Sequence, residues 1–119
     1  RNIKLERCGG WFYGNLPYGD IVLRADGRDY AAPVVFDNIQ SSDGANAGIT
    51  VIWGKDKVQN ITVKNSQFTN NGKCAVEIFR DARGALTLDH VEFINTPSPL
   101  LINQSPATFQ VIGLESPTQ

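Results

Sequence analysis

Three short segments of the sequence mix acidic and basic residues, and their side chains are the ones best suited to chemistry. The segments are Asp26, Arg28 and Asp29, then Lys55, Asp56 and Lys57, and then Arg80, Asp81 and Arg83. Arginine binds a carboxylate with a bidentate fork, and lysine binds it as a point charge. Aspartate oxygens are ligands of the kind that Ca²⁺ takes. The segments therefore predict a site for an acidic ligand. This chemistry requires no cofactor, and calcium is the one that such a site would accept.

Elimination next to a uronate carboxylate is a reaction that these residues would support. A lysine or arginine with a lowered pKa can abstract the proton α to the carboxylate. The candidate catalytic residues are Lys55, Asp56, Arg80 and Asp81. The candidate substrate-binding residues are Arg28, Lys57 and Arg83, with Trp11, Tyr30 and Trp53 as flat faces on which sugar rings stack. The same charges also fit an ordinary solvated edge that has no function.

A second set of charges is predicted to form a column on the outer face of a sheet. Asp37, Lys64 and Asp89 hold equal places in successive repeats of the chain. Opposite charges on adjacent strands form an ion-pair ladder, in which each pair contributes about 0.2–1 kcal/mol. The two carboxylates, two strands apart, alternatively fit the spacing that an inverting glycosidase uses to admit water.

The single histidine shares a turn position with two asparagines. Asn38, Asn65 and His90 fall at the same point of three successive repeats. Stacked amides hydrogen-bond along such a column, so we expect His90 to be a member of a ladder or a partly buried turn residue. The alternative is a general base that titrates near its unperturbed pKa. No cluster of residues predicts a zinc site.

All these residues are positioned by a repeat. Between Gly48 and Phe93 the same order occurs twice: a short apolar strand, a charged turn, an alternating strand and a polar turn. Units of this size, each too small to bury its own face, are typical of stacked repeats. Two series of inward apolar residues extend the repeat in phase, which predicts four to five coils. The series are Ile21, Ile49, Val76 and Leu100, and Ile3, Val34, Ile61, Leu86 and Phe109.

No window keeps apolar residues at helical spacing, so the chain is predicted to be all-β. Outside the central repeat we expect strands over residues 2–8, 20–24, 33–38, 100–103 and 108–112. Parallel pairing is predicted between Val51 and Ile78 and between Val63 and Leu88. The predicted core consists of Ile21, Leu23, Val34, Phe36, Ile49, Val51, Ile61, Val63, Val76, Ile78, Leu86 and Leu88.

Length and composition limit the classes of function. The 119 residues suit one domain, 1–119, which we interpret as a fragment of a longer protein. Lys and Arg number 11 against 12 Asp and Glu, which does not favour a nucleic-acid partner held by bulk charge. No apolar run is long enough to span a membrane. Cys8 and Cys74 predict two buried free thiols, with a disulfide as the less favoured alternative.

The segment NITVKNSQFTNNG, residues 60–72, followed by CAVEIFRDARGALTLDHVEFINT, residues 74–96, resembles the coil repeat of right-handed parallel β-helix proteins, the pectin-lyase-like superfamily. This superfamily includes pectate lyases, polygalacturonases, alginate epimerases and phage tailspike depolymerases. The resemblance extends over residues 2–114 as a pattern, and no catalytic motif of a member family matches. It implies a right-handed parallel β-helix that binds or cleaves a polysaccharide, outside the cell or on a virion surface.

The ends of such a stack expose unpaired strand edges, which proteins cover by caps or by association. We therefore expect a missing neighbouring domain or a homo-oligomer, such as a trimer. The loop over residues 9–20 carries Trp11, Phe12, Tyr13 and Tyr18. These aromatics predict either a plug over the open end or a platform for sugar rings. The alternative function is therefore that of a non-catalytic spacer, adhesin or oligomerisation segment.

Overall fold

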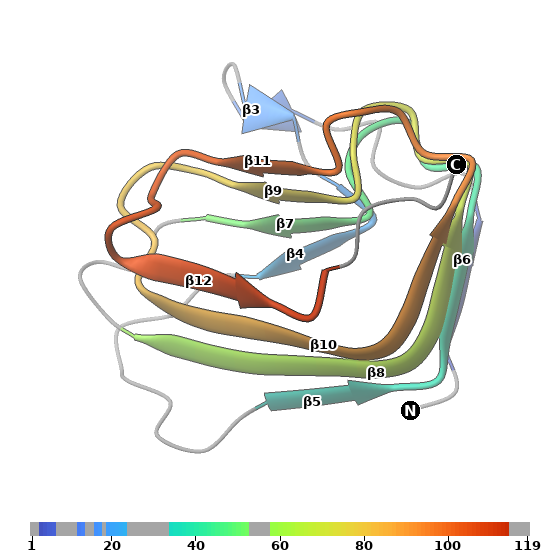
Figure 1. The fold of residues 1–119 in the computed structure, drawn as a ribbon. Helices are drawn as coiled ribbons and strands as arrows, with labels where there is room; N and C mark the ends of the chain where they lie inside the picture. Colours follow the sequence, from blue (N-terminus) through green and yellow to red (C-terminus); the bar gives the residue numbers. More distant parts are fainter. Residues whose placement is uncertain are drawn as a thin grey trace.

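The computed structural model describes residues 3–6, 12–13, 16–17, 19–23, 34–52 and 58–114. Every regular element in these ranges is a β-strand, which confirms the all-β prediction for them (Figure 1). In chain order the strands are β1 (Ile3–Glu6), β2 (Phe12–Tyr13), β3 (Leu16–Pro17), β4 (Ile21–Leu23), β5 (Val34–Asp37), β6 (Ile39–Ser42), β7 (Ile49–Val51), β8 (Gln59–Thr69), β9 (Val76–Ile78), β10 (Gly84–Ile94), β11 (Leu101–Asn103) and β12 (Phe109–Ile112).

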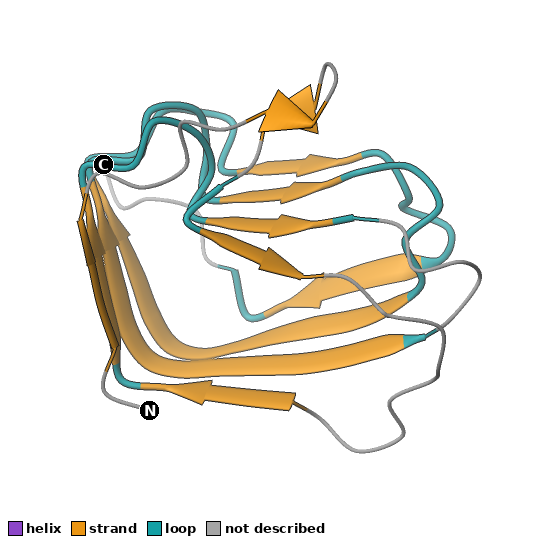
Figure 2. Ribbon diagram, turned by 180° about the vertical axis from the view of Figure 1, so that it is seen from behind, coloured by secondary structure: helices purple, strands orange, loops and turns teal. Residues whose placement is uncertain are grey.

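The strands form a parallel β-solenoid of about three turns. One sheet has the order β11-β9-β7-β4, and the other has the order β1-β6-β8-β10-β12 with β5 also paired to β8. Strands β2 and β3 form a separate antiparallel pair. Strands β8 and β10 each run for 11 residues. Figure 2 shows them bending round a corner, so that each forms two sides of its coil.

The number of turns is lower than the four to five coils predicted from the sequence. Strand β1 lies beside β6, with Ile3 opposite Ile39, whereas the sequence pattern aligns Ile3 with Val34. At the other end, β12 pairs only with the residues from Gly84 to Thr87 of β10. The pattern counted the partial turns at both ends as whole coils.

The register in the middle of the stack agrees with the prediction. Val51 lies opposite Ile78, and Val63 lies opposite Leu88. Both pairings are parallel. The strand-to-strand contacts of the central coils were therefore predictable from the apolar pattern alone.

The register of the last coil differs from the prediction. Val76 pairs with Leu101, one residue later than predicted. Leu86 pairs with Val111 rather than with Phe109. Phe109 is also fully buried, and residues two apart share one face of a strand. Alternation alone therefore cannot separate the two registers.

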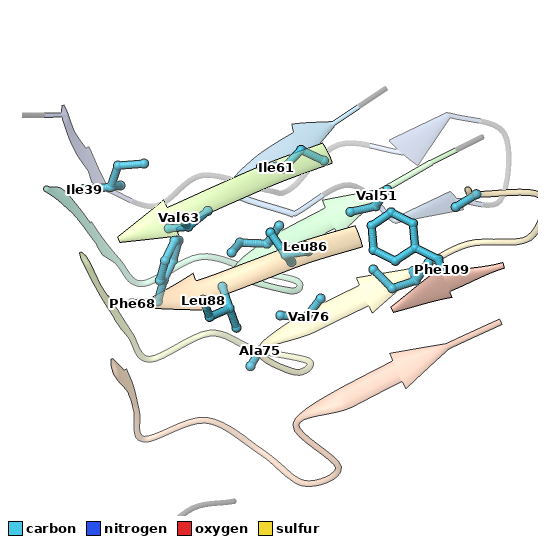
Figure 3. Packing of buried hydrophobic residues seen from close by; sticks show 13 residues of the cluster. Ile39, Val51, Ile61, Val63, Phe68, Ala75, Val76, Leu86, Leu88 and Phe109 are labelled. Carbon is cyan, nitrogen blue, oxygen red and sulfur yellow. The ribbon is translucent and has the colours of Figure 1, made fainter. Parts of the chain in front are cut away.

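Buried apolar side chains fill the space between the two sheets (Figure 3). Phe68 stacks on Phe93 with the ring centroids 5.2 Å apart and the ring planes 17° from parallel. The residues predicted to point inward from the central coils all belong to this cluster: Ile49, Val51, Ile61, Val63, Val76, Ile78, Leu86 and Leu88.

The first coil is packed less completely. Ile21, Leu23 and Phe36 are partly buried against the cluster. Val34 is 40% exposed, which contradicts its predicted place in the core. It lies on β5, which pairs only with β8 in the described part of the chain. One side of β5 therefore lacks a neighbouring strand there.

Polar residues with a left-handed backbone turn the chain at the corner within β8 and β10. Asn38, Asn65 and His90 have φ values of 60°, 52° and 55°, which confirms that they share a turn position. The Asn65 amide donates to Asp37 Oδ1 at 3.2 Å, one residue before Asn38 in the neighbouring coil, and the amide ladder between Asn38 and Asn65 stays a prediction.

An amide ladder runs along the next corner. Asp43, Asn70 and Asn95 have φ values of 60°, 59° and 53°. The Asn70 amide donates to Asp43 Oδ1 at 2.9 Å, and the Asn95 amide donates to Asn70 Oδ1 at 2.7 Å. Asparagine and aspartate tolerate the left-handed region better than most residues. The same side chains therefore permit the turn and link successive turns.

A half-buried carboxylate links three successive turns at the same corner. Asp20 Oδ2 accepts hydrogen bonds from Ser41 Oγ at 2.6 Å and from the Asn71 amide at 2.9 Å. A Cβ at Gly44 would stand 2.0 Å from Asp20 Oδ1, so only glycine leaves room for the carboxylate. Burial raises the pKa of Asp20, and the hydrogen bonds from Ser41 and Asn71 oppose that shift.

Substitution of Asn70 tests the contribution of the ladder to stability. Asn70→Ala removes both side-chain hydrogen bonds and places alanine in the left-handed region, so the free energy of unfolding should fall by about 1–2 kcal/mol. Asn70→Gly removes the same bonds but relieves the backbone, so its loss should be smaller. Denaturant unfolding measures both values. An Asn70→Ala protein as stable as wild type would contradict the ladder.

The stability contributed by Asp20 should depend on pH. The folded chain holds the Asp20 proton more tightly than the unfolded chain, whose carboxyl titrates near 3.8. The contribution is therefore complete below that value and is lost as the pH rises through the raised folded pKa. In buffer free of metal ions, the stability of wild type relative to Asp20→Asn should increase as the pH falls from about 7 to about 4. Asp43→Asn, which changes an exposed carboxylate, is the control, and a difference independent of pH would contradict the prediction.

Candidate functional site

One hollow on the surface brings together three of the predicted site residues. Arg80, Asp81 and Arg83 lie in the turn between β9 and β10 and line a hollow of about 500 Å³. The rest of its described wall comes from residues 104–108, which connect β11 to β12. The three charged side chains are exposed. The hollow is therefore built from equivalent turns of two neighbouring coils.

Hydrogen bonds fix the backbone beneath this hollow. Ser105 is 7% exposed, and its Oγ accepts from the Ala82 N–H at 3.2 Å while donating to the Phe79 carbonyl at 2.7 Å. Thr108 Oγ1 donates to the Ala82 carbonyl at 2.7 Å. Ala82 is fully buried. The N–H and the carbonyl of Ala82 are therefore both hydrogen-bonded. These bonds fix the turn from which the charged side chains on either side of Ala82 project.

The hollow has the groups needed to bind an anion. Arg80 and Arg83 each present a planar guanidinium that matches the two oxygens of a carboxylate. Asp81, whose φ is 66°, is the one carboxylate among the described lining residues. Hydrolysis by paired carboxylates requires a second acid. The described lining therefore supports binding more directly than it supports cleavage.

The remaining predicted site residues lie outside the part of the chain that the structure describes. They are Trp11, Arg28, Tyr30, Trp53, Lys55, Asp56 and Lys57, together with Asp26 and Asp29 of the charged segments. Strands β7 and β8, which flank residues 53–57, are direct neighbours of β9 and β10, which flank the hollow.

Sequence reasoning missed the wall that residues 104–108 provide. Ser105 follows Arg80 by 25 residues, the interval that also separates the paired residues Leu86 and Val111. The period of the repeat would thus have aligned these two turns. The segment gives no chemical signal in the sequence, because its residues, unlike those of the three charged segments, carry no charge.

The outward column of charges has the predicted register, because Lys64 lies opposite both Asp37 and Asp89. His90 differs from its predicted role in a ladder or a partly buried turn. Its side chain is 83% exposed, and its Nδ1 lies 2.6 Å from Asp89 Oδ1. Both residues line a second hollow, of about 490 Å³, together with Glu92.

Cys74 is a buried free thiol, as predicted, and Cys8 lies outside the described residues. Burial raises the pKa of Cys74 to about 12, and the negative charge of Glu77 adds to the shift. Glu77 is 2% exposed and binds Lys73 Nζ through Oε2 at 2.9 Å. A thiol with this pKa stays protonated at neutral pH, so Cys74 is not a nucleophile there.

Comparison of the chain with protein-family models, with curated proteins and with solved structures found no match. The fold class therefore rests on the structure itself. The resemblance to pectin-lyase-like proteins is consistent with a parallel β-solenoid. No comparison shows that the chain belongs to that superfamily. Among the described residues, no helix is long and apolar enough to cross a membrane. The same residues contain no group of three or more His, Cys, Asp and Glu placed to hold a metal ion.

Ser105→Ala tests whether the hollow depends on its buried hydrogen bonds. The substitution leaves the Ala82 N–H and the Phe79 carbonyl without their partner, so the free energy of unfolding should fall by about 2–4 kcal/mol. Ser98→Ala, at an exposed serine in a different turn, should change it by less than about 0.5 kcal/mol. Equal stabilities of the two variants in denaturant unfolding would show that Ser105 does not hold the turn.

Proposed function

We propose that this chain is a segment of a carbohydrate-active β-solenoid protein and that it binds an acidic polysaccharide along its charged edge. The observation that carries the proposal is the hollow of about 500 Å³ in which Arg80 and Arg83 flank Asp81. Uronate carboxylates would bind to the two guanidinium groups. Asp81 would accept hydrogen bonds from sugar hydroxyls between them.

The architecture around the hollow suits a polymer more than a small anion. The lining comes from turns of two neighbouring coils, which lie about 4.8 Å apart in a parallel sheet. A glycan chain that runs along the stacking axis would contact both turns. Because the turns are fixed by hydrogen bonds, little ordering would be needed on binding.

Cleavage is the finer form of this proposal. Elimination or hydrolysis would use Arg80 and Asp81 together with Lys55 and Asp56, which hold the equivalent place in the sequence repeat. Such a protein would act where acidic polysaccharides occur, outside the cell or on a virion surface. Calcium would join the site only through the aspartates of the charged segments.

A structural role is the second candidate function, and the apolar residues at the ends of the stack favour it. Val34 and Val35 on β5 are 40% and 51% exposed, and Ile112 on β12 is 52% exposed. Each of these two strands pairs with only one other strand in the described part of the chain. Stacking on a neighbouring domain or on another copy, as in a trimeric fibre, would cover them.

Removal of both arginines from the hollow tests the proposed function. Arg80→Ala with Arg83→Ala should weaken binding to uronate oligosaccharides about tenfold or more, because each charged hydrogen bond lost contributes about 1.5–3 kcal/mol. The melting temperature should stay close to that of wild type, since both side chains are exposed. Isothermal titration and thermal unfolding provide the two measurements.

The matched control is the double variant Lys4→Ala with Lys64→Ala, which removes the same charge from other surfaces of the solenoid. This control should bind uronates nearly as well as wild type. Equal weakening of binding in both double variants would show that the loss of net charge explains the effect. That outcome would contradict a site at the hollow. If wild type binds no acidic glycan, the structural role is left as the function.

A further inference from the structure

The large apolar side chains that are exposed in the described part of the chain all lie on strands with an open edge. They are Val22, Val34, Val35, Ile94 and Ile112, between 38% and 52% exposed. The first three lie on β4 and β5, each of which pairs with only one strand among the described residues. The other two lie on β10 and β12. Figure 1 shows β4 and β5 on one side of the stack and β12 on the other. The exposed apolar surface is therefore concentrated at the two ends of the solenoid.

The two ends of the stack are stepped, and the steps are complementary. Strands β5 and β6 pair with the first and second halves of β8, and β1 adds one more strand beside β6 but none beside β5. At the other end, β12 pairs with β10 from Gly84 to Thr87. No described strand lies on that side of β10 from Leu88 to Ile94. A second copy could therefore place its β1 beside the second half of β10, while β12 fills the open place beside the β5 of that copy.

The inward column of the long sheet is apolar from one end to the other. Val34, Ile61, Leu86 and Val111 hold one position in successive coils. Ile61 and Leu86 are buried, and Val111 is partly buried against the core. Val34, at the open end of the column, is 40% exposed. Val111 of one copy over Val34 of the next would continue the core across the junction.

The outward column of the same strands has matching apolar ends. Val35, Thr62, Thr87 and Ile112 lie opposite one another in successive coils. The two threonines in the middle are partly buried, whereas Val35 and Ile112 at the ends are 51% and 52% exposed. Cross-strand pairs of β-branched side chains are favourable in sheets. At a junction between two copies, Ile112 would form such a pair with Val35 and cover the exposed surface of both.

Two further columns have complementary ends. In the short sheet, Val22 and Ile102 are the end members of one column, so the same stacking would bring these two β-branched side chains together. On the second half of the long sheet, Lys4 begins a column that Glu92 ends. Both side chains are exposed and opposite in charge. The register therefore brings apolar residues opposite apolar residues and a lysine opposite a glutamate.

We propose that one end of this solenoid binds the opposite end of a second copy, so that both parallel sheets continue from copy to copy. The strand pairs formed at each junction are β10 with β1, β12 with β5, and β11 with β4. The contact joins two different surfaces, and a contact of this kind that does not close into a ring gives an open-ended assembly. Open strand edges and exposed apolar side chains are covered together. The proposal rests on the structural role given above as the second candidate function, and it does not depend on glycan binding.

Sedimentation of the 119-residue chain over a wide range of concentrations, without glycan, tests the proposal. Wild type should form oligomers that lengthen with concentration, because the ends of each oligomer can bind further copies. Val35→Lys and Ile112→Lys each place a charge at one end of the stack. Each variant alone should associate about tenfold more weakly or worse, because the lysine would be buried at the junction. Both positions are exposed in the single chain, so thermal unfolding of the monomers should change little.

A mixture of the two lysine variants distinguishes this contact from association through any other surface. In the mixture, the unchanged last strand of Val35→Lys can bind the unchanged first coil of Ile112→Lys, and both outer ends of that pair are blocked. The mixture should therefore form dimers of the two variants and nothing longer. Thr62→Lys, in the middle of the same outward column, is the matched control and should associate like wild type.

Three outcomes would overturn the proposal. One is a wild type that stays monomeric at every concentration, which would leave a neighbouring domain as the cover of the two ends. Another is a mixture that associates no better than either variant alone. The third is equal association of wild type and all the variants, which would show contact through another surface. Titration of the arginine variants with uronates measures glycan binding separately, so failure of stacking and failure of glycan binding are distinguishable.

Discussion

In-register parallel pairing between successive coils is the constraint on which the rest of this structure depends. Each residue of a strand lies directly opposite its equivalent in the next coil, as Val51 lies opposite Ile78 and Lys64 opposite Asp89. Side chains at equal positions are therefore forced into contact along the stack. A residue is acceptable at a given position only if it is compatible with the same position one coil above and one coil below.

The polar positions meet this constraint in different ways. At one corner, Asp43, Asn70 and Asn95 alternate donor and acceptor, so that each amide uses both of its polar atoms or faces solvent. On the outer face, a lysine separates two aspartates. At the charged edge the guanidinium groups point to solvent while the backbone beneath them is held by Ser105 and Thr108. Most of these charged side chains therefore lie at the surface. The exceptions are the half-buried carboxylate of Asp20 and the buried carboxylate of Glu77.

The sequence alone predicted the fold class and the central register, because eight apolar residues repeat in phase with almost no interruption. It failed at the ends, where Ile3 and Phe109 offered plausible inward positions in the wrong register. It predicted that Arg80, Asp81 and Arg83 share an edge, since charge stands out in a sequence. It did not predict the wall at Ser105, because that segment carries no charge. It did not predict the Asp20–Asn71 pair, because a side chain that reaches across two turns leaves no periodic signal.

The hydrogen bond between Asp20 and Asn71 also bears on how the solenoid folds. In a stack where each coil contacts only its neighbours, folding can begin at any coil and spread stepwise. Asp20 reaches a residue 51 positions later, beyond the adjacent turn. This contact makes the first and third turns depend on each other directly. Loss of the outermost coil would therefore also remove a hydrogen bond from the coil two levels away.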